Sequence, residues 1–303
     1  QGCNFRCLYC ANPDTIAGKG GTPTPPEEII RMAMSQRPFF GKRGGITFSG
    51  GEPTFQAKAL VPLVRELKEK GIHVCIDSNG GLWNEDVEKL FQLTDLVLLD
   101  IKEFNPARHQ MLTGRSNEQT IRTATWLEEN GKPFWLRYVL VPGYSDFEED
   151  IRQLGEALGK YKMIQRVEIL PYHTLGVHKY EAMEQEYKLK DVKENTPEQL
   201  EKAAEVFNPF NRFTVGFLKT PMSGNRSYHN RFRGCNYIQR GRHRGRWTSV
   251  VIIAIRIKSQ YFNLLSQISH IIISQCPTGN VNRYWHFFRP EADKSLGHPL
   301  ARP

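Results

Sequence analysis

Between residues 26 and 217 the chain alternates short apolar runs with amphipathic stretches of helical periodicity. One apolar run follows the previous one after roughly 25 to 35 residues, which is the length of a βα unit. Because consecutive parallel strands must be joined by a crossover, usually a helix, the alternation predicts an α/β fold with a parallel sheet, open or barrel-like. The predicted strands span residues 46–49, 73–78, 96–101, 135–141, 167–170 and 213–217, and the predicted helices span residues 26–35, 58–70, 84–93, 118–130, 146–158 and 196–207.

Polar residues that can carry chemistry cluster where these predicted strands end. In parallel α/β folds the loops at the carboxyl ends of the strands form the active site. We therefore expect these residues to lie together at the carboxyl end of the sheet. They are Gly50, Gly51 and Glu52 after the first strand, Asp77 and Ser78 on the second, Asp100 and Lys102 at the end of the third, and His173 after the fifth.

The net charge of +9 is concentrated at one end of the chain. Residues 217–303 carry 14 Lys and Arg against Glu291 and Asp293, a net charge of +12, whereas residues 1–216 carry 27 basic and 30 acidic side chains. The net charge of the first 216 residues is thus −3, which is ordinary for a globular domain. This division predicts two parts, a folded domain over residues 1–216 and a basic tail over residues 217–303.

The tail shows no sustained helical or strand periodicity, and 11 of its 14 basic residues are Arg. It is interpreted as an irregular, non-native or weakly ordered extension, for example from a fused or frame-shifted reading frame. The alternative is a nucleic-acid-binding appendage, because Arg clusters with interleaved aromatic residues bind phosphate and stack on bases. Nucleic acid is not the expected partner.

No segment has the pattern of a signal peptide or a membrane-spanning helix. The longest apolar run, SVVIIAI at residues 249–255, is far shorter than the roughly 18 residues that a transmembrane helix needs. The cysteines are bunched rather than spread as a disulfide framework, which favours a metal or redox role. A cytoplasmic protein without membrane contact is expected.

Three cysteines lie within the first ten residues, in QGCNFRCLYCANPDT. Structural zinc takes four ligands, and no second cysteine pair follows Cys3, Cys7 and Cys10 nearby. Cys75 falls inside a predicted strand and is expected to be a buried small hydrophobe. Three thiolates on a short loop suit instead a [4Fe-4S] cluster with one iron left open for a substrate or cofactor.

The C-x3-C-x2-C spacing, with the aromatic Tyr9 before the last cysteine, resembles the cluster loop of radical S-adenosylmethionine enzymes. The resemblance implies a partial (βα)6 barrel whose open iron chelates S-adenosylmethionine. One electron from the cluster would then cleave the cofactor to methionine and a 5′-deoxyadenosyl radical. No further catalytic residue is expected beyond the cofactor ligands.

The stretch FSGGEPT at residues 48–54 follows a predicted strand, and its two glycines would let a polar ligand approach the backbone. Taken alone it is equally compatible with a tight βα turn. After the cluster loop it resembles the motif that holds the amino group of S-adenosylmethionine. The resemblance as a whole implies that the cofactor-binding residues are Tyr9, Cys10, Ala11, Gly50, Gly51, Glu52, Asp100, Ile101, Lys102 and His173.

Asp100 and Lys102 are two residues apart, so they share one face of a strand end. They can be a structural ion pair, or, by the resemblance, Lys102 meets the cofactor carboxylate. A monovalent cation near that carboxylate is implied at Asp77, Ser78 and Asp100. For Asp77 and Ser78 the alternative is a strand-end cap.

Two further stretches, LPYHTLGVHKY with His173 and RYVLVPGYSD with Arg137, resemble the glycyl-radical enzyme activases. Between Cys10 and Gly50 there is no cysteine, so the ferredoxin-like insert of many such activases is absent. The resemblance therefore implies the compact type, a monomer that acts on pyruvate formate-lyase and receives electrons from reduced flavodoxin or ferredoxin. The alternatives are an activase of another glycyl-radical enzyme and a truncated, inactive fusion product that only binds a cluster.

The sequence departs from the family in three places. Ala11 stands where many relatives have His, which removes one side-chain contact. The chain begins at the cluster loop, so the first strand is expected to be missing and one sheet edge to be open. The tail after about residue 215 has no counterpart.

Overall fold

The computed structural model describes residues 1–18, 21–41, 44–207, 214–217, 238–243, 246–257 and 268–275. Its strands are β1 (Pro23–Thr24), β2 (Ile46–Gly50), β3 (Val74–Ser78), β4 (Leu96–Asp100), β5 (Phe134–Leu140), β6 (Ile164–Pro171), β7 (Thr214–Phe217), β8 (Ile238–His243), β9 (Arg246–Ile257) and β10 (Ile268–Gln275). Its helices are α1 (Pro26–Phe40), α2 (Ala57–Glu69), α3 (Glu85–Leu93), α4 (Pro106–Thr113), α5 (Glu118–Glu129), α6 (Glu148–Leu158), α7 (Val177–Ala182) and α8 (Pro197–Phe207), with short 3-10 helices η1 (Pro13–Thr15) and η2 (Pro53–Gln56).

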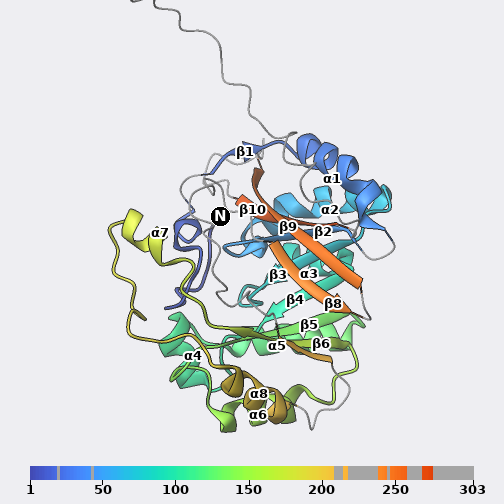
Figure 1. Ribbon diagram of the computed structural model, residues 1–303. Helices are drawn as coiled ribbons and strands as arrows, with labels where there is room; N and C mark the ends of the chain where they lie inside the picture. The colour runs from blue at the N-terminus through green and yellow to red at the C-terminus, as the bar shows by residue number, and fades with distance from the viewer. Residues whose placement is uncertain are drawn as a thin grey trace, which may run out of the picture.

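Strands β2 to β7 lie in chain order and pair in parallel, which confirms the predicted α/β class. Helices α1, α2 and α3 lie along one side of the strands, and the first residues of the chain lie beside α7 on the other (Figure 1). The carboxyl ends of β2 to β6 consequently face one region, next to the cysteine loop.

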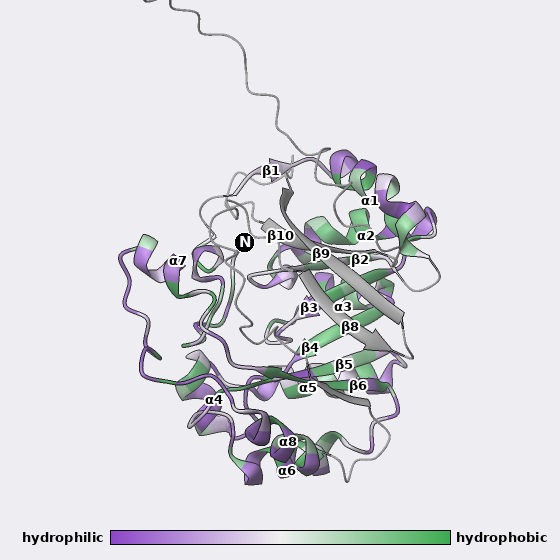
Figure 2. Ribbon diagram, viewed as in Figure 1, coloured by the Kyte–Doolittle hydropathy of each residue, from purple (hydrophilic) through white to green (hydrophobic). Residues whose placement is uncertain are grey.

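Apolar residues recur along the strands and helices (Figure 2), and their buried side chains form one main core. Leu67 of α2, Leu90 of α3 and Val97 of β4 are buried together there. Burying such a side chain stabilises the fold by about 1.5 to 3 kcal/mol relative to exposure. This packing fixes the strand ends on which the polar residues stand.

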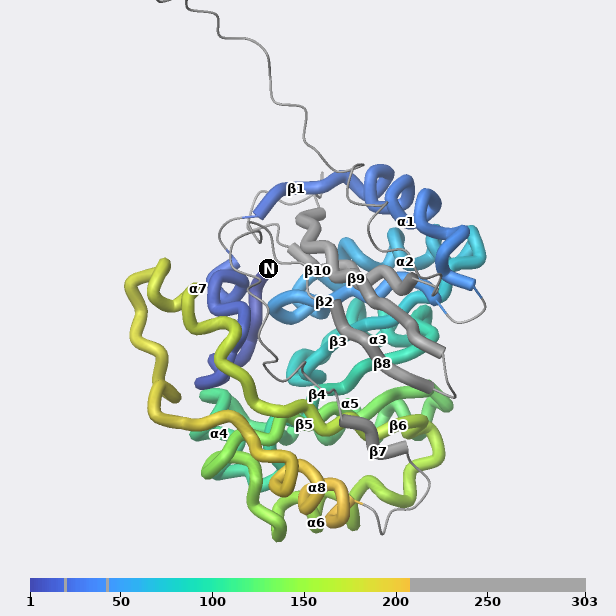
Figure 3. Tube along the Cα trace, viewed as in Figure 1, coloured from blue at the N-terminus to red at the C-terminus, as the bar shows by residue number. Residues whose placement is uncertain are grey.

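Two helices lack a sequence signal strong enough to predict them. Helix α4 has no clear apolar stripe; Asn105 caps it by accepting hydrogen bonds from the backbone of Ala107 and Arg108, and Gly114 ends it with φ 73°. Helix α7 spans only six residues. It lies beside the first residues of the chain (Figure 3).

Strands β8, β9 and β10 lie within residues 217–303, where the sequence showed no sustained periodicity. The β-branched runs of β9 and β10 favour extended pairing, a preference that depends on a partner strand and so escapes a search for periodicity. Strand β10 pairs antiparallel with β2, at the sheet edge that was expected to be open. The boundary at residue 216 remains a prediction. Within the described ranges, no helix combines the length and apolar character needed to cross a membrane.

Glu103 gives the fold a testable pH dependence. It is fully buried, its Oε1 accepts from the backbone of Phe104 (2.6 Å) and Asn105 (2.9 Å), and its Oε2 accepts from Tyr138 Oη (3.1 Å). Burial raises the pKa of this carboxyl to about 7. The folded protein therefore holds this proton more tightly than the unfolded chain does.

We expect this contribution to stability to be complete below pH 4.5 and to be lost as pH rises to about 7. Glu103→Gln should flatten that fall, by on the order of 1 to 3 kcal/mol between pH 5 and pH 8. Urea unfolding at both pH values measures it, with exposed Glu129→Gln as the control. Equal slopes for the wild type and Glu103→Gln would contradict the assignment.

Candidate active site

The first ten residues form an extended loop held at both sides by backbone hydrogen bonds. Gly2 O accepts from Glu52 N (2.6 Å), on the turn after β2. Arg6 N and Leu8 N donate to the carbonyls of Thr113 and Leu112 at the end of α4 (2.7 and 2.9 Å). The unpredicted α4 is therefore part of the site, because it supports the cysteine loop.

The three cysteines are free thiols on this loop and are partly exposed. Burial raises the pKa of Cys3 and Cys7 to about 12 and also raises that of Cys10, so binding of iron must displace their protons. In the described part of the chain, no three Cys, His, Asp or Glu side chains are arranged to hold a single metal ion. Structural zinc takes four ligands at one ion, whereas a four-iron cluster binds each cysteine at a different iron. Cys75 is buried in β3, as predicted.

The Gly-Gly-Glu turn contacts the cysteine loop directly. A Cβ atom on Gly51 would lie 2.3 Å from Gly2 O, so glycine is required there by the loop as well as by any ligand. Glu52 is buried, and its carboxylate accepts from Thr54 N and Oγ1, Ser78 Oγ (2.8 Å) and Asn79 N (2.7 Å). These bonds occupy the Glu52 carboxylate, so the backbone of the turn is the part left to meet a cofactor.

Asp100 and Lys102 form an ion pair, with 2.6 Å between Nζ and Oδ2. Lys102 Nζ also lies 5.9 Å from the ring centroid of Tyr9. Burial alone would lower the pKa of Lys102, but Asp100 keeps it well above its usual range. The ion pair predicted as the structural alternative is present, and it stands beside the cysteine loop. Ile101 is fully buried, so only its backbone can contribute to a cofactor site.

Two buried oxygen atoms at this place, Asp100 Oδ1 and Tyr9 Oη, have no hydrogen-bond partner among the residues that the structure describes. Buried polar atoms are normally paired. Buried oxygen atoms without a hydrogen bond beside Lys102 and the cysteines fit a site that a polar ligand completes. The residues present therefore fit both the cluster and S-adenosylmethionine.

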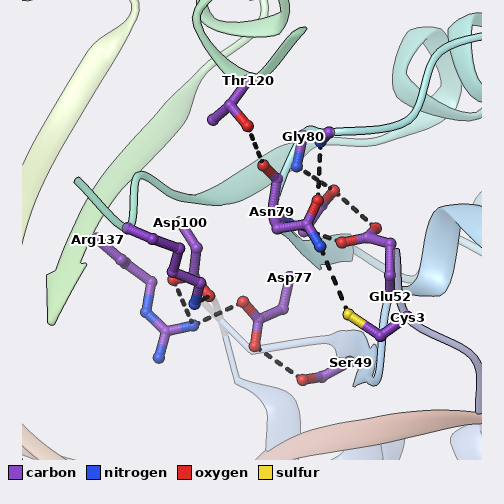
Figure 4. A network of polar contacts seen from close by, with 12 residues as sticks. Cys3, Ser49, Glu52, Asp77, Asn79, Gly80, Asp100, Thr120 and Arg137 are labelled. Carbon is purple, nitrogen blue, oxygen red and sulfur yellow. Dashed lines mark hydrogen bonds and ion pairs between the residues drawn. The ribbon is translucent and has the colours of Figure 1, made fainter. Parts of the chain in front are cut away.

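Arg137 lies in a charged row across three strands. In the parallel register Asp100 of β4 is opposite Arg137 of β5, which is opposite Glu168 of β6. Arg137 Nη1 donates to Asp77 Oδ1 (2.6 Å) and lies 3.8 Å from Asp100 Oδ1 (Figure 4). Burial alone would lower the pKa of Arg137, but the surrounding carboxylates raise it. Glu168 and the position of Arg137 within this row were not predicted, because strand register has no local sequence signal.

Asp77 and Ser78 have different hydrogen-bond partners. Asp77 Oδ2 accepts from Ser49 Oγ (2.8 Å) and its other oxygen from Arg137, whereas Ser78 Oγ donates to Glu52. Ser78 Oγ also accepts from Gly80 N (2.9 Å), which is the strand-end cap predicted as the alternative.

His173 follows β6, at the same end of the sheet as the other site residues. Burial lowers the pKa of His173, which favours the neutral imidazole near pH 7. The segment after it packs on the cysteine loop: a Cβ on Gly176 would lie 2.6 Å from Ala11 Cα, and Lys179 Nζ donates to Asn12 Oδ1 (2.8 Å). Glycine is therefore required at residue 176, because its backbone lies too close to the backbone of Ala11 to leave room for a Cβ atom.

Comparisons with known proteins agree with this geometry. The model of the radical SAM superfamily matches residues 1–155. The chain is 44% identical over 216 residues to the pyruvate formate-lyase-activating enzyme of Streptococcus mutans, covering 69% of this chain and 82% of the relative. It is 39% identical over 213 residues to pyruvate formate-lyase 1-activating enzyme of Escherichia coli K12, covering 69% and 87%.

Among solved structures, the fold resembles Streptococcus suis SuiB bound to S-adenosylmethionine, with a TM-score of 0.52 and 18% identity over 71% of this chain and 47% of that one. A radical SAM methyltransferase from Sphaerobacter thermophilus gives 0.52 and 16%, over 72% and 64%. These likenesses show the fold, and the sequence relatives show the family. The chain belongs to the radical SAM superfamily and, within it, to the pyruvate formate-lyase-activating enzymes.

Proposed function

We propose that this chain is an iron–sulfur oxidoreductase that activates pyruvate formate-lyase, by taking a hydrogen atom from a backbone glycine and leaving a glycyl radical. The observation that carries the proposal is the contact between the three-cysteine loop and the Gly-Gly-Glu turn, in a chain 39 to 44% identical to such activating enzymes. When bound, the cluster and S-adenosylmethionine together supply a 5′-deoxyadenosyl radical.

Cys3, Cys7 and Cys10 would hold the cluster. Gly50 and Gly51 would present backbone groups to the amino group of the cofactor, next to Tyr9, Cys10 and Ala11. Lys102, held by Asp100, would meet the cofactor carboxylate, and His173 would face the cofactor from the loop after β6. The protein's contribution is thus ligation, orientation and exclusion of water.

The test is formation of the glycyl radical. Anaerobically reconstituted protein, S-adenosylmethionine, a chemical reductant and pyruvate formate-lyase should give the electron paramagnetic resonance (EPR) signal of a protein glycyl radical. A partner variant with alanine at the radical glycine should not. If a different glycyl-radical enzyme gains the signal and pyruvate formate-lyase does not, the chain is an activase of that other class. Cluster binding without cofactor cleavage would identify an inactive fusion product.

The same proposal includes a reduced flavodoxin or ferredoxin as the electron donor. It also includes a monomeric state and a cytoplasmic location for this chain. Reduction kinetics with each purified donor, and light scattering of the loaded protein, test them directly.

A monovalent cation beside Asp77, Ser78 and Asp100 is the second part of the cofactor proposal. The carboxylates of Asp77 and Asp100 support it, but Arg137 already lies between them. A cation must therefore displace the guanidinium or share the two carboxylates with it. We expect K⁺ to lower the KM for S-adenosylmethionine by only about threefold relative to tetramethylammonium. An identical KM in both salts would mean that Arg137 supplies the positive charge there.

Removing residues 217–303 is expected to leave cluster content and cofactor cleavage intact, because every proposed site residue precedes the tail. Full-length and truncated protein should be compared at low and moderate salt, since a tail that binds an acidic partner surface would act in a salt-dependent way. Loss of cleavage at both salt concentrations would mean that the pairing of β10 with β2 completes the fold. The boundary near residue 216 would then be wrong.

A further inference from the structure

Asn79, which follows β3, makes a side-chain contact with a cluster cysteine that nothing in the proposed mechanism uses. Its Nδ2 lies 3.7 Å from Cys3 Sγ (Figure 4). Backbone amides of Phe5 and Asn12 also donate to Cys3 and Cys10, respectively. Unlike those amides, the Asn79 donor comes from a distant strand end and can be removed by substitution.

The orientation of the Asn79 amide is fixed by a backbone donor. Gly81 N donates to Asn79 Oδ1 (2.8 Å), and so does Asn4 Nδ2 (3.3 Å), so the atom near Gly81 must be the carbonyl oxygen and the atom near Cys3 must be the NH₂ nitrogen. One N–H of that group donates to Asn4 Oδ1 (2.8 Å). The other is left for Cys3 Sγ.

The position of Asn79 is equally well determined. Its backbone N–H donates to Glu52 Oε2 (2.7 Å), and its carbonyl accepts from Thr120 Oγ1 (2.7 Å). The residue is only 6% exposed. These bonds do not depend on the side chain, so a substitution can remove the amide donor while the backbone stays in place.

We propose that Asn79 raises the reduction potential of the cluster by donating an N–H···S hydrogen bond to Cys3. Reduction adds one electron and therefore negative charge to the cluster and its sulfur ligands. A donor aimed at a ligand sulfur stabilises that charge, and hydrogen bonds to the sulfurs are one of the features that set such potentials. Asn79 is thus a positioning and tuning residue for electron transfer; the inference rests on the proposed cluster.

The experiment is an EPR-monitored redox titration of reconstituted full-length protein without any partner enzyme. Asn79→Leu should lower the equilibrium constant for one-electron reduction by about tenfold, equivalent to about 59 mV. Asn79→Asp should lower it further, because the oxygen that replaces Nδ2 cannot donate and adds negative charge. Thr120→Val is the matched control: it loses the bond to the Asn79 carbonyl but keeps the amide donor, so stability should fall while the potential stays.

A potential for Asn79→Leu equal to that of the wild type would overturn the inference. If Asn79→Leu fails to hold a cluster, Asn79→Asp decides, and a potential no lower than wild type overturns it equally. A fall of the same size in Thr120→Val would assign the effect to packing and reject the hydrogen bond. Wild-type protein without four irons would instead refute the proposed function, so the two failures can be told apart.

Discussion

Replacing Cys7 by alanine should abolish assembly of the cluster, reducing bound iron and sulfide from about four of each to near zero. The loop offers three thiols, and loss of one leaves too few protein ligands to hold three of the four irons. Iron and sulfide analysis after anaerobic reconstitution, with the absorption and EPR spectra of the product, measures the effect. Cofactor cleavage should disappear with the cluster.

Cys75→Ala is the matched control, because Cys75 is also a reduced cysteine but is buried in β3, paired with Thr47 and Leu96 of its neighbouring strands. It should bind iron and sulfide as the wild type does, at some loss of stability from the smaller side chain. Stoichiometric zinc without sulfide in the wild type, or a full cluster in Cys7→Ala, would contradict the assignment.

Substituting Asp for Gly51 should have the next largest effect, a loss of most of the cluster as well as of its response to S-adenosylmethionine. The sequence suggested only that a side chain there would obstruct the cofactor. The structure adds a steric reason, since a Cβ would lie 2.3 Å from Gly2 O and 2.9 Å from Gly2 C. The cysteine loop must move, and with it the bond between Glu52 N and Gly2 O.

Gly51→Ala separates the two reasons, because it carries the Cβ without the charge. We expect overpacking by this one methyl group to cost roughly 1 to 3 kcal/mol and to lower cluster occupancy on its own. Gly131→Asp is the control, since a Cβ at Gly131 meets no atom within 4 Å and Asp adopts its left-handed backbone at a smaller cost than most residues do. Full cluster content in Gly51→Asp, measured as iron and sulfide, would show that the loop does not depend on this contact.

Much of the fold could be predicted because its signals are local. The apolar runs of β2 to β6 and the stripes of α2, α3 and α6 repeat within a few residues, and Asn84 caps α3 by accepting a hydrogen bond from Val87 N. Helices α4 and α7 escaped prediction because one lacks an apolar stripe and the other is too short to show a period. Both contact the cysteine loop, so the missing elements belong to the site.

The sequence by itself determined the ligand set, since the spacing of Cys3, Cys7 and Cys10 is a property of one short loop. Only the tertiary structure decided which groups surround that loop. Strand register, set by packing between segments about 30 residues apart, aligns Arg137 between Asp100 and Glu168. The same packing brings Asn79 close to Cys3. No local pattern encodes these contacts, because each depends on how whole strands are placed against one another.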